Sequence, residues 1–215
     1  LHVDTGSKRR TMTGQDGIYA FQDLPIGGYE LSATHPGFKK ALKQGIELHV
    51  SDRLGIDVRL EVGELAQEVS VTDSVEQVQT ESGEQGSLIS GEQVRELQLN
   101  GRSFMTLLEV VPGVASNMSD RMDPNSSPSV SINGARSTAS NFNIDGGNNS
   151  DVIVGSSALN TFTSVESIAE FTVLTSTFSA EYGRAGFSQV NVVTKGGTKH
   201  FRGSLYEFFR NDALD

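Results

Sequence analysis

Hydrophobic and polar residues alternate with a period of two through much of residues 14–62. The alternating apolar positions are Tyr19 and Phe21, then Tyr29, Leu31 and Ala33, then Ile46, Leu48 and Val50, and finally the run from Ile56 to Val62. Turn residues separate these runs, as at Asp16-Gly17, Gly27-Gly28 and His35-Pro36-Gly37. Short alternating runs with this punctuation are typical of half-buried antiparallel strands. The pattern predicts a small β-sandwich over residues 1–62.

Helical spacing follows in residues 90–113. Ser90 and Gln93 form a capping-box pattern that predicts a helix start, with Val94 and Leu97 on one apolar face and Asn100-Gly101 at its end. A second helix is predicted from Ser103 to Pro112-Gly113, because its apolar residues repeat at helical spacing: Phe104, Leu107, Leu108 and Val111. We interpret both apolar faces as core.

Short strands are predicted again in the last part of the chain. Ile132 marks one strand, and Phe142 with Ile144 marks the next, with 136–141 as their connection. One helical turn should lead into a strand at 171–174, and a glycine-punctuated turn should precede a strand at 189–194. Two short helices with several strands predict a compact α+β domain over residues 81–200.

Composition narrows the range of functions. The 215 residues carry a formal net charge of -10, which argues against nucleic-acid binding. There is no cysteine, so the sequence excludes disulfides and thiolate chemistry. No run approaches the roughly 18 apolar residues of a membrane-spanning helix. Leu1 is not a start methionine and the first residues read as mid-strand, so we expect the natural ends to lie outside this sequence.

No catalytic or metal motif is recognisable. The four histidines lack H-x-x-E or H-E-x-x-H spacing, and there is neither a phosphate-binding loop nor a G-x-S-x-G elbow. Glu166 and Glu170 are interpreted as a solvated helix face. We therefore predict no enzyme activity, no cofactor and no metal.

The stretch "SINGARSTASNFNIDGGNNSD" is the best candidate for a metal loop. Counted from Asp145, however, Gly147 and Ser150 occupy positions where a calcium loop needs Asp or Asn and Gly. An irregular calcium site of Asp145, Asn149 and Asp151 stays open as an alternative to a turn.

Two stretches resemble known families. "DGIYAFQDLPIGGYELSATHPGFKK" resembles the carboxypeptidase-regulatory-like domain, which implies a non-catalytic, transthyretin-like β-sandwich whose first strand is truncated here. The chain from about residue 81 resembles the plug domain of TonB-dependent outer-membrane receptors. The residues that match the plug motifs are Asn133, Gly134, Arg136, Asn141, Asp145, Gly146, Tyr182 and Gly183, followed by "VTKGGT". Many plugs have Arg-Gly where this chain has Asn133-Gly134, which favours the Oar-like branch.

The resemblance implies a partner. In such receptors a TonB-type periplasmic coupling protein pulls on an exposed strand, the TonB box. "QEVSVTDS" in the linker 63–80 is similar to such a box, and its candidate residues are Glu68, Val69, Ser70, Val71 and Thr72. Val69 and Val71 alternate with polar residues, as expected of a strand that can join another sheet. A strand of the sandwich or a plain linker are the alternatives.

Residues 201–215 are expected to begin a transmembrane β-barrel, with Tyr206, Phe208 and Phe209 near the membrane interface. The fold class is thus β-rich with two domains, a transthyretin-like β-sandwich and a small α+β plug, before the first strand of a missing barrel. The resemblance implies a plug that gates energy-coupled uptake of a glycan, peptide or siderophore at the cell outer membrane. The alternative is a secreted or surface module that binds carbohydrate or protein without transport.

Overall fold

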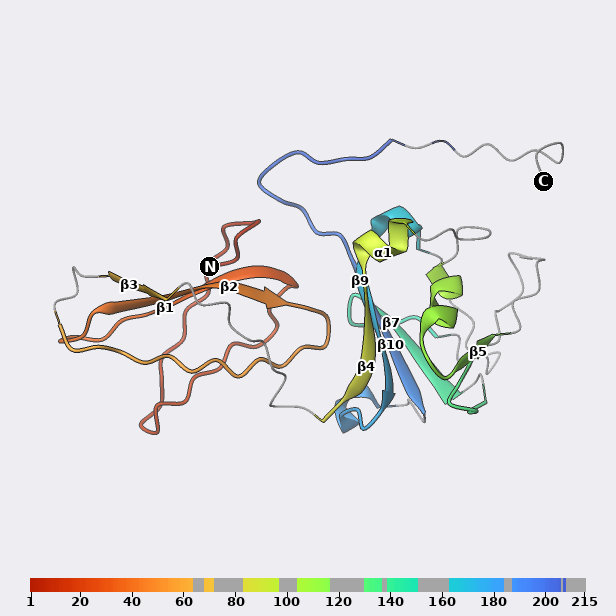
Figure 1. Ribbon diagram of the computed structural model, residues 1–215, viewed down its shortest axis with the longest axis horizontal. Helices are drawn as coiled ribbons and strands as arrows, with labels where there is room; N and C mark the ends of the chain where they lie inside the picture. Colours follow the sequence, from red (N-terminus) through yellow and green to blue (C-terminus); the bar gives the residue numbers. More distant parts are fainter. Residues whose placement is uncertain are drawn as a thin grey trace.

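The computed structural model describes residues 1–63, 68–71, 83–96, 104–116, 130–136, 139–150, 163–183, 187–205 and 207. Figure 1 shows two modules: an N-terminal one built on β1, β2 and β3, and a C-terminal one built around β4, β7, β9 and β10. The chain is β-rich with few helices, which confirms the predicted fold class.

A three-stranded sheet forms the centre of the N-terminal module. β1 (Gly27–Ala33) and β2 (Lys40–Leu48) pair antiparallel, and β3 (Glu68–Val71) pairs parallel with β2. The sheet order is therefore β1-β2-β3. The link between β1 and β2 contains the predicted turn, where Gly37 has a φ of 84° that glycine adopts without strain.

Two other runs that the alternation assigned to strands join no ladder. The segment around Tyr19 and Phe21 has no strand pairing, and the run 56–62 makes one isolated bridge, to Phe38. The prediction of strands there was wrong. In the second run Ile56, Val58 and Leu60 are half-buried as expected, but Val62 is exposed. The phenol of Tyr19 donates to the carbonyl of Ile56. Side-chain contacts therefore join these runs where the alternation had predicted a backbone ladder.

A five-stranded mixed sheet forms the C-terminal module, in the order β4-β9-β10-β7-β8. Its strands are β4 (Gln85–Ser90), β7 (Ser140–Ile144), β8 (Gly147–Asn148), β9 (Ile168–Ser176) and β10 (Ser188–Thr194). The central strand β10 pairs antiparallel with β9 and parallel with β7. The predicted helical turn is the 3₁₀ helix η4 (Val165–Ser167), and β9 follows it directly. A separate two-stranded sheet pairs β5 (Val114–Ser116) with β6 (Val130–Ile132).

The first predicted helix is α1 (Gly91–Glu96), and its capping box is confirmed. The Ser90 N–H donates to Gln93 Oε1 at 2.9 Å, and the Gln93 N–H donates to Ser90 Oγ at 3.3 Å. This reciprocal pair satisfies two amides that the helix start would otherwise leave without partners.

The second predicted helix is η2 (Phe104–Val110), which the structure shows to be a 3₁₀ helix. Its apolar side chains are nevertheless buried, with Leu107 and Leu108 at most 1% exposed. Packing stabilises this short helix, because so few turns gain little from their own hydrogen bonds. None of the helices that the structure describes is long and apolar enough to cross a membrane.

One face of the five-stranded sheet carries the core of the C-terminal module. Its largest fully buried members are Phe142, Phe171, Met105, Leu107, Leu108, Ile132 and Ile168. Burying one such side chain contributes about 1.5–3 kcal/mol. The strands alternate, so that Val190 and Val192 of β10 face this core while Gln189 and Asn191 lie on the opposite face.

The chain runs on from β10 in a tail whose described residues, 195–205 and 207, are exposed and belong to no strand (Figure 1). Phe201 and Leu205 are fully exposed. Tyr206, Phe208 and Phe209 lie outside the described residues. The first barrel strand that was expected at 201–215 therefore stays a prediction.

Candidate functional site: an edge strand and a polar sheet face

The candidate coupling strand, β3, is an edge strand of the N-terminal sheet. The β2–β3 register pairs Lys40 with Glu68, Ala41 with Val69, Leu42 with Ser70, and Lys43 with Val71. Among the residues that the structure describes, no strand pairs with the other edge of β3. An edge strand of this kind can pair with a further strand through its backbone groups. Thr72 lies outside the described residues.

Asn133 and Gly134 form the turn that follows β6. Their φ angles are 52° and 75°, in the left-handed region that glycine and asparagine tolerate best. The Asn133 N–H donates to the Gly113 carbonyl at 2.8 Å, and its side-chain Nδ2 donates to the Thr175 carbonyl at 3.1 Å. The turn is thereby tied to the end of β9. The Arg136 side chain, two residues later, is exposed.

Asn141 belongs to a row of hydrogen-bonded amides on the sheet face opposite the core. We call Asn141, Gln189 and Asn191 the amide row. Asn141 Nδ2 donates to Gln189 Oε1 at 3.0 Å, and Gln189 Nε2 donates to Asn191 Oδ1 at 2.7 Å. All three residues are at most 8% exposed. Asn191 Nδ2 in turn donates to Ser51 Oγ at 2.8 Å, so the row ends on the N-terminal module.

Asp145 and Gly146 form the turn between β7 and β8, with φ angles of 48° and 80°. The Asp145 carboxylate accepts from the N–H and the hydroxyl of Thr194, each at 2.8 Å. Both carboxylate oxygens thus tie the turn to the end of β10. The described residues contain no group of three His, Cys, Asp or Glu that could hold a metal ion. Asp151, the third residue of the irregular calcium alternative, lies outside them.

Tyr182 and Gly183 end the 3₁₀ helix η5 (Ala180–Tyr182), which Ser179 caps by accepting from the Glu181 N–H. Gly183 has a φ of 60°. Burial raises the pKa of the Tyr182 phenol, and a hydrogen bond with Ser51 acts in the opposite direction. Tyr182 therefore packs at the junction with the N-terminal module.

The predicted plug residues do not form one site. Asn133 bonds to Thr175 near the end of β9, and Tyr182 follows that end of the strand within a few residues. Asp145 bonds to Thr194, whose partner in the ladder is Ile168 at the start of β9. The motif residues thus lie at both ends of the sheet, and the amide row lies between them.

A set of polar contacts that the sequence did not predict joins the two modules. We call it the clasp, and it is made by residues 49–53, directly after β2. Glu170 Oε2 lies 3.0 Å from His49 Nδ1, and the other carboxylate oxygen accepts from the Val50 N–H. Arg53 pairs with Glu181, and Ser51 accepts from the amide row.

The interpretation of Glu170 as part of a solvated helix face was wrong. The residue lies on β9 and is 7% exposed. Alternation along β9 places Phe171 and Val173 on the core face and Glu170 with Thr172 on the polar face. The sequence did contain this alternation, but nothing in it showed that another module covers the polar face.

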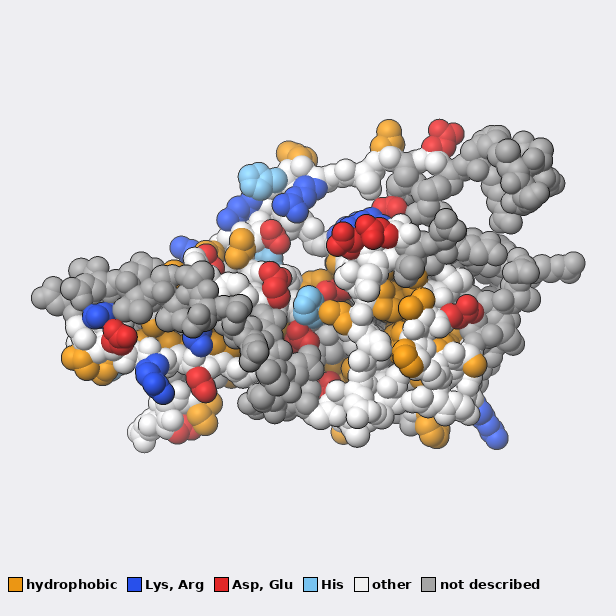
Figure 2. All heavy atoms as spheres, in the orientation of Figure 1, with side chains coloured by type: hydrophobic (Ala, Val, Ile, Leu, Met, Phe, Trp, Pro, Cys, Tyr) orange, Lys and Arg blue, Asp and Glu red, His pale blue; other side chains and the backbone are white. Residues whose placement is uncertain are grey.

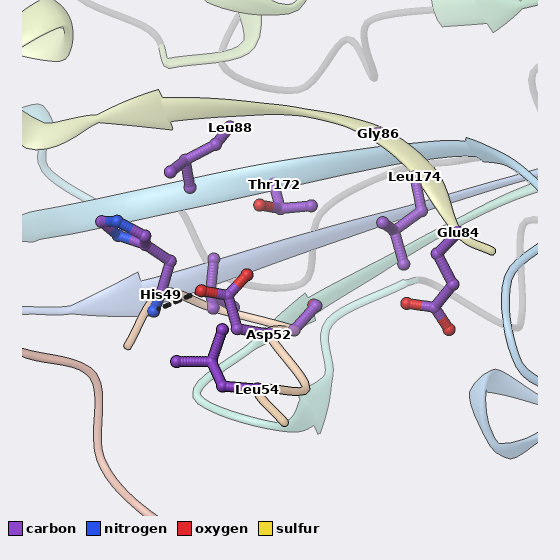
Figure 3. Close-up of a pocket in the computed structure, with 10 residues that line it drawn as sticks. His49, Asp52, Leu54, Glu84, Gly86, Leu88, Thr172 and Leu174 are labelled. Carbon is purple, nitrogen blue, oxygen red and sulfur yellow. Dashed lines mark hydrogen bonds between the residues drawn. The ribbon is translucent and has the colours of Figure 1, made fainter. Parts of the chain in front are cut away.

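A cleft of about 300 Å³ lies beside the clasp, between the two modules (Figure 3). It is lined by His49, Asp52 and Leu54 from one module and by Glu84, Gly86, Leu88, Thr172 and Leu174 from the other. The His49 N–H donates to Asp52 Oδ2 at 2.9 Å. Figure 2 shows acidic and basic side chains interspersed over both modules. On the face in that view, the charges of the described residues therefore do not single out a binding site.

Comparison with known families gives two matches in chain order. Residues 1–61 match the carboxypeptidase regulatory-like domain, and residues 70–190 match the TonB-dependent receptor plug domain. The chain is also 25% identical over 207 residues to the TonB-dependent transporter Oar of Myxococcus xanthus. That alignment covers 93% of this chain and 18% of the transporter, so the chain spans a small part of its relative.

Solved structures of a siderophore receptor and a peptide importer align with about half of the chain. The siderophore receptor PirA of Acinetobacter baumannii aligns with a TM-score of 0.44 and 20% identity, over 53% of this chain and 17% of that protein. The RagAB peptide importer in its closed-closed state aligns with a TM-score of 0.42 and 24% identity, over 55% of this chain and 13% of the importer chain.

Proposed function

Because the chain belongs to the TonB-dependent receptor plug domain family, we propose that it forms the plug and N-terminal extension of an energy-coupled outer-membrane transporter. The matched families indicate a receptor and transporter, and not an enzyme. The observation that carries the proposal is β3, an edge strand of the N-terminal sheet that precedes the plug in the chain and has no strand on its outer edge among the described residues.

In this proposal a TonB-type periplasmic protein adds a strand to residues 68–72. Strand addition gives affinity through backbone hydrogen bonds, and it requires an exposed edge in extended conformation. Over Glu68–Val71 the chain is extended, and no described strand pairs with the outer edge of β3, which supports this mode of binding. The coupling protein then pulls on a chain that continues directly into the plug, whose sheet begins at Gln85.

The plug itself contributes no covalent chemistry in this proposal. It fills a transmembrane barrel, opens when the coupling protein pulls, and admits a substrate from the cell surface into the periplasm. The turns at Asn133 and Asp145 and the amide row serve to hold the sheet together in the closed state. The proposed domain limits are 1–62 for the N-terminal module, 63–80 for a linker whose strand β3 joins the N-terminal sheet, and 81–200 for the plug.

A capture experiment tests the proposal. The immobilised periplasmic domain of the TonB-type protein should retain the 215-residue chain, and Val69→Pro or Val71→Pro should abolish retention, because proline removes a backbone donor from the strand. Val62→Pro is the matched control, since Val62 is 80% exposed and the backbone hydrogen bonds at its bridge come from its neighbours. Equal retention of all four proteins would remove residues 68–72 as the coupling strand.

A further inference from the structure

Three features of β3 concern how the rest of the chain holds it: its pairing, its outer edge and the link of its partner strand to the clasp. The strand extends the N-terminal sheet by parallel pairing with β2, over all four of its residues. Its outer edge carries no strand among the described residues. β2, the strand that pairs with β3, ends at Leu48, and the clasp begins at the next residue, His49. β3 is therefore held in a defined place relative to the plug sheet.

We propose that the N-terminal module presents β3 to the coupling protein as a pre-ordered strand. The inference rests on the proposed function and deepens it. The partner strand extends the sheet on its free edge, in the order β1-β2-β3-partner, while β2 stays paired on the other side. The interaction surface is then a sheet edge of a folded module, and its partner is an edge strand of a periplasmic protein.

Conformational entropy is the reason that this arrangement strengthens binding. A free linker that becomes a strand on binding loses backbone freedom at each residue that it orders. Residues 68–71 have already lost that freedom through their pairing with β2. Pre-ordering of a binding segment raises affinity chiefly by removing this cost from the association step.

The β2–β3 register also offers a way to weaken presentation without touching the strand that binds. Lys40 is the ladder partner of Glu68, so the register pairs a basic residue with an acidic one. Lys40→Glu places two acidic residues in register, and like charges directly opposite destabilise strand pairing. Lys43→Glu is the matched control. Lys43 lies on β2, like Lys40, but its ladder partner on β3 is the uncharged Val71.

The test compares the affinity of the coupling protein's periplasmic domain for four probes, by calorimetric titration. The probes are the 215-residue chain, its Lys40→Glu and Lys43→Glu variants, and a synthetic peptide of residues 64–75. The chain should bind about tenfold or more tightly than the peptide, because the module has already ordered the strand. Lys40→Glu should lose most of that advantage, and Lys43→Glu should keep it.

Two different failures are distinguishable. If the peptide binds as tightly as the chain, or more tightly, presentation is wrong while residues 68–72 remain the coupling strand. The same conclusion follows if Lys40→Glu and Lys43→Glu bind alike. If neither chain nor peptide binds, the coupling strand of the proposed function is itself wrong, and the inference is rejected with it.

Discussion

The carboxylate of Glu170, on β9 of the plug sheet, lies 3.0 Å from Nδ1 of His49 in the N-terminal module. Its second oxygen accepts from the neighbouring Val50 N–H. A buried carboxylate is stable only with such partners, and here those partners come from another module. The position of the N-terminal module on the plug thus depends on a residue of the plug sheet.

Removing this carboxylate should destabilise the chain. Glu170→Ala leaves the Val50 N–H without its partner at a partly buried position, and we expect the free energy of unfolding to fall by about 1–3 kcal/mol. Urea unfolding followed by circular dichroism measures the change. Glu181→Ala is the control, because its pair with Arg53 is exposed and should contribute less than about 1 kcal/mol. Equal effects of the two variants would contradict a special role for Glu170.

The Asp145 turn should depend on its carboxylate. Asp145→Ala removes two hydrogen bonds to Thr194 and puts alanine at a φ of 48°, so we expect a loss of about 1–3 kcal/mol. Asp145→Asn keeps one side-chain oxygen and tolerates this backbone conformation, so its loss should be smaller. Thermal unfolding of the three proteins decides the order. An unchanged melting temperature for Asp145→Ala would show that the turn holds without its side chain.

Gly134 should be required for its backbone conformation alone. An added Cβ would meet no atom within 4 Å, yet the φ of 75° is strained for alanine. We expect Gly134→Ala to cost about 1–2 kcal/mol of unfolding free energy. Gly196→Ala should have almost no effect, because that glycine has neither a left-handed φ nor a close neighbour. Similar values for the two variants would argue against strain at the turn.

Alkaline pH should weaken the fold through its tyrosines. Burial raises the pKa of Tyr19 and Tyr182 above the ordinary 10.0, so the folded state favours the neutral phenol. The stabilisation of the folded state by the two neutral phenols is fully present below pH 10.0. It is lost as the pH rises through the raised pKa values. The free energy of unfolding should be smaller at pH values above 10.0 than at pH values below it. Tyr19→Phe should reduce the fall, and an identical pH profile for wild type and variant would contradict this contribution.

Local patterns in the sequence predicted local structure well. The capping box of Ser90 and Gln93, the turn before β9, and β10 all depend on residues close together in the chain. Contacts between segments that are distant in the chain were harder to predict from the sequence. The alternation predicted that Ile56, Val58 and Leu60 would be half-buried, but not whether a strand would lie within hydrogen-bonding distance of them.

The same limit applies to the candidate site. The alternation of Val69 and Val71 predicted a strand, but only the structure shows that β2 holds it. Glu170 was misread because its burial depends on a module more than a hundred residues earlier in the chain, as its bond to His49 shows. Side chains buried between modules carry no periodic signal that distinguishes them from solvated ones.

The central claim, coupling through the free edge of β3, is tested most directly by cysteine cross-linking. The chain has no cysteine of its own. Ser70 of β3 and Ser32 of β1 are both ladder partners of Leu42, and they lie on opposite edges of the same sheet. Single Ser70→Cys and Ser32→Cys variants are mixed with a TonB-type periplasmic domain that carries one cysteine on its edge strand. The account predicts a disulfide-linked complex with Ser70→Cys and none with Ser32→Cys. Equal cross-linking of both variants, or cross-linking of Ser32→Cys alone, would contradict it.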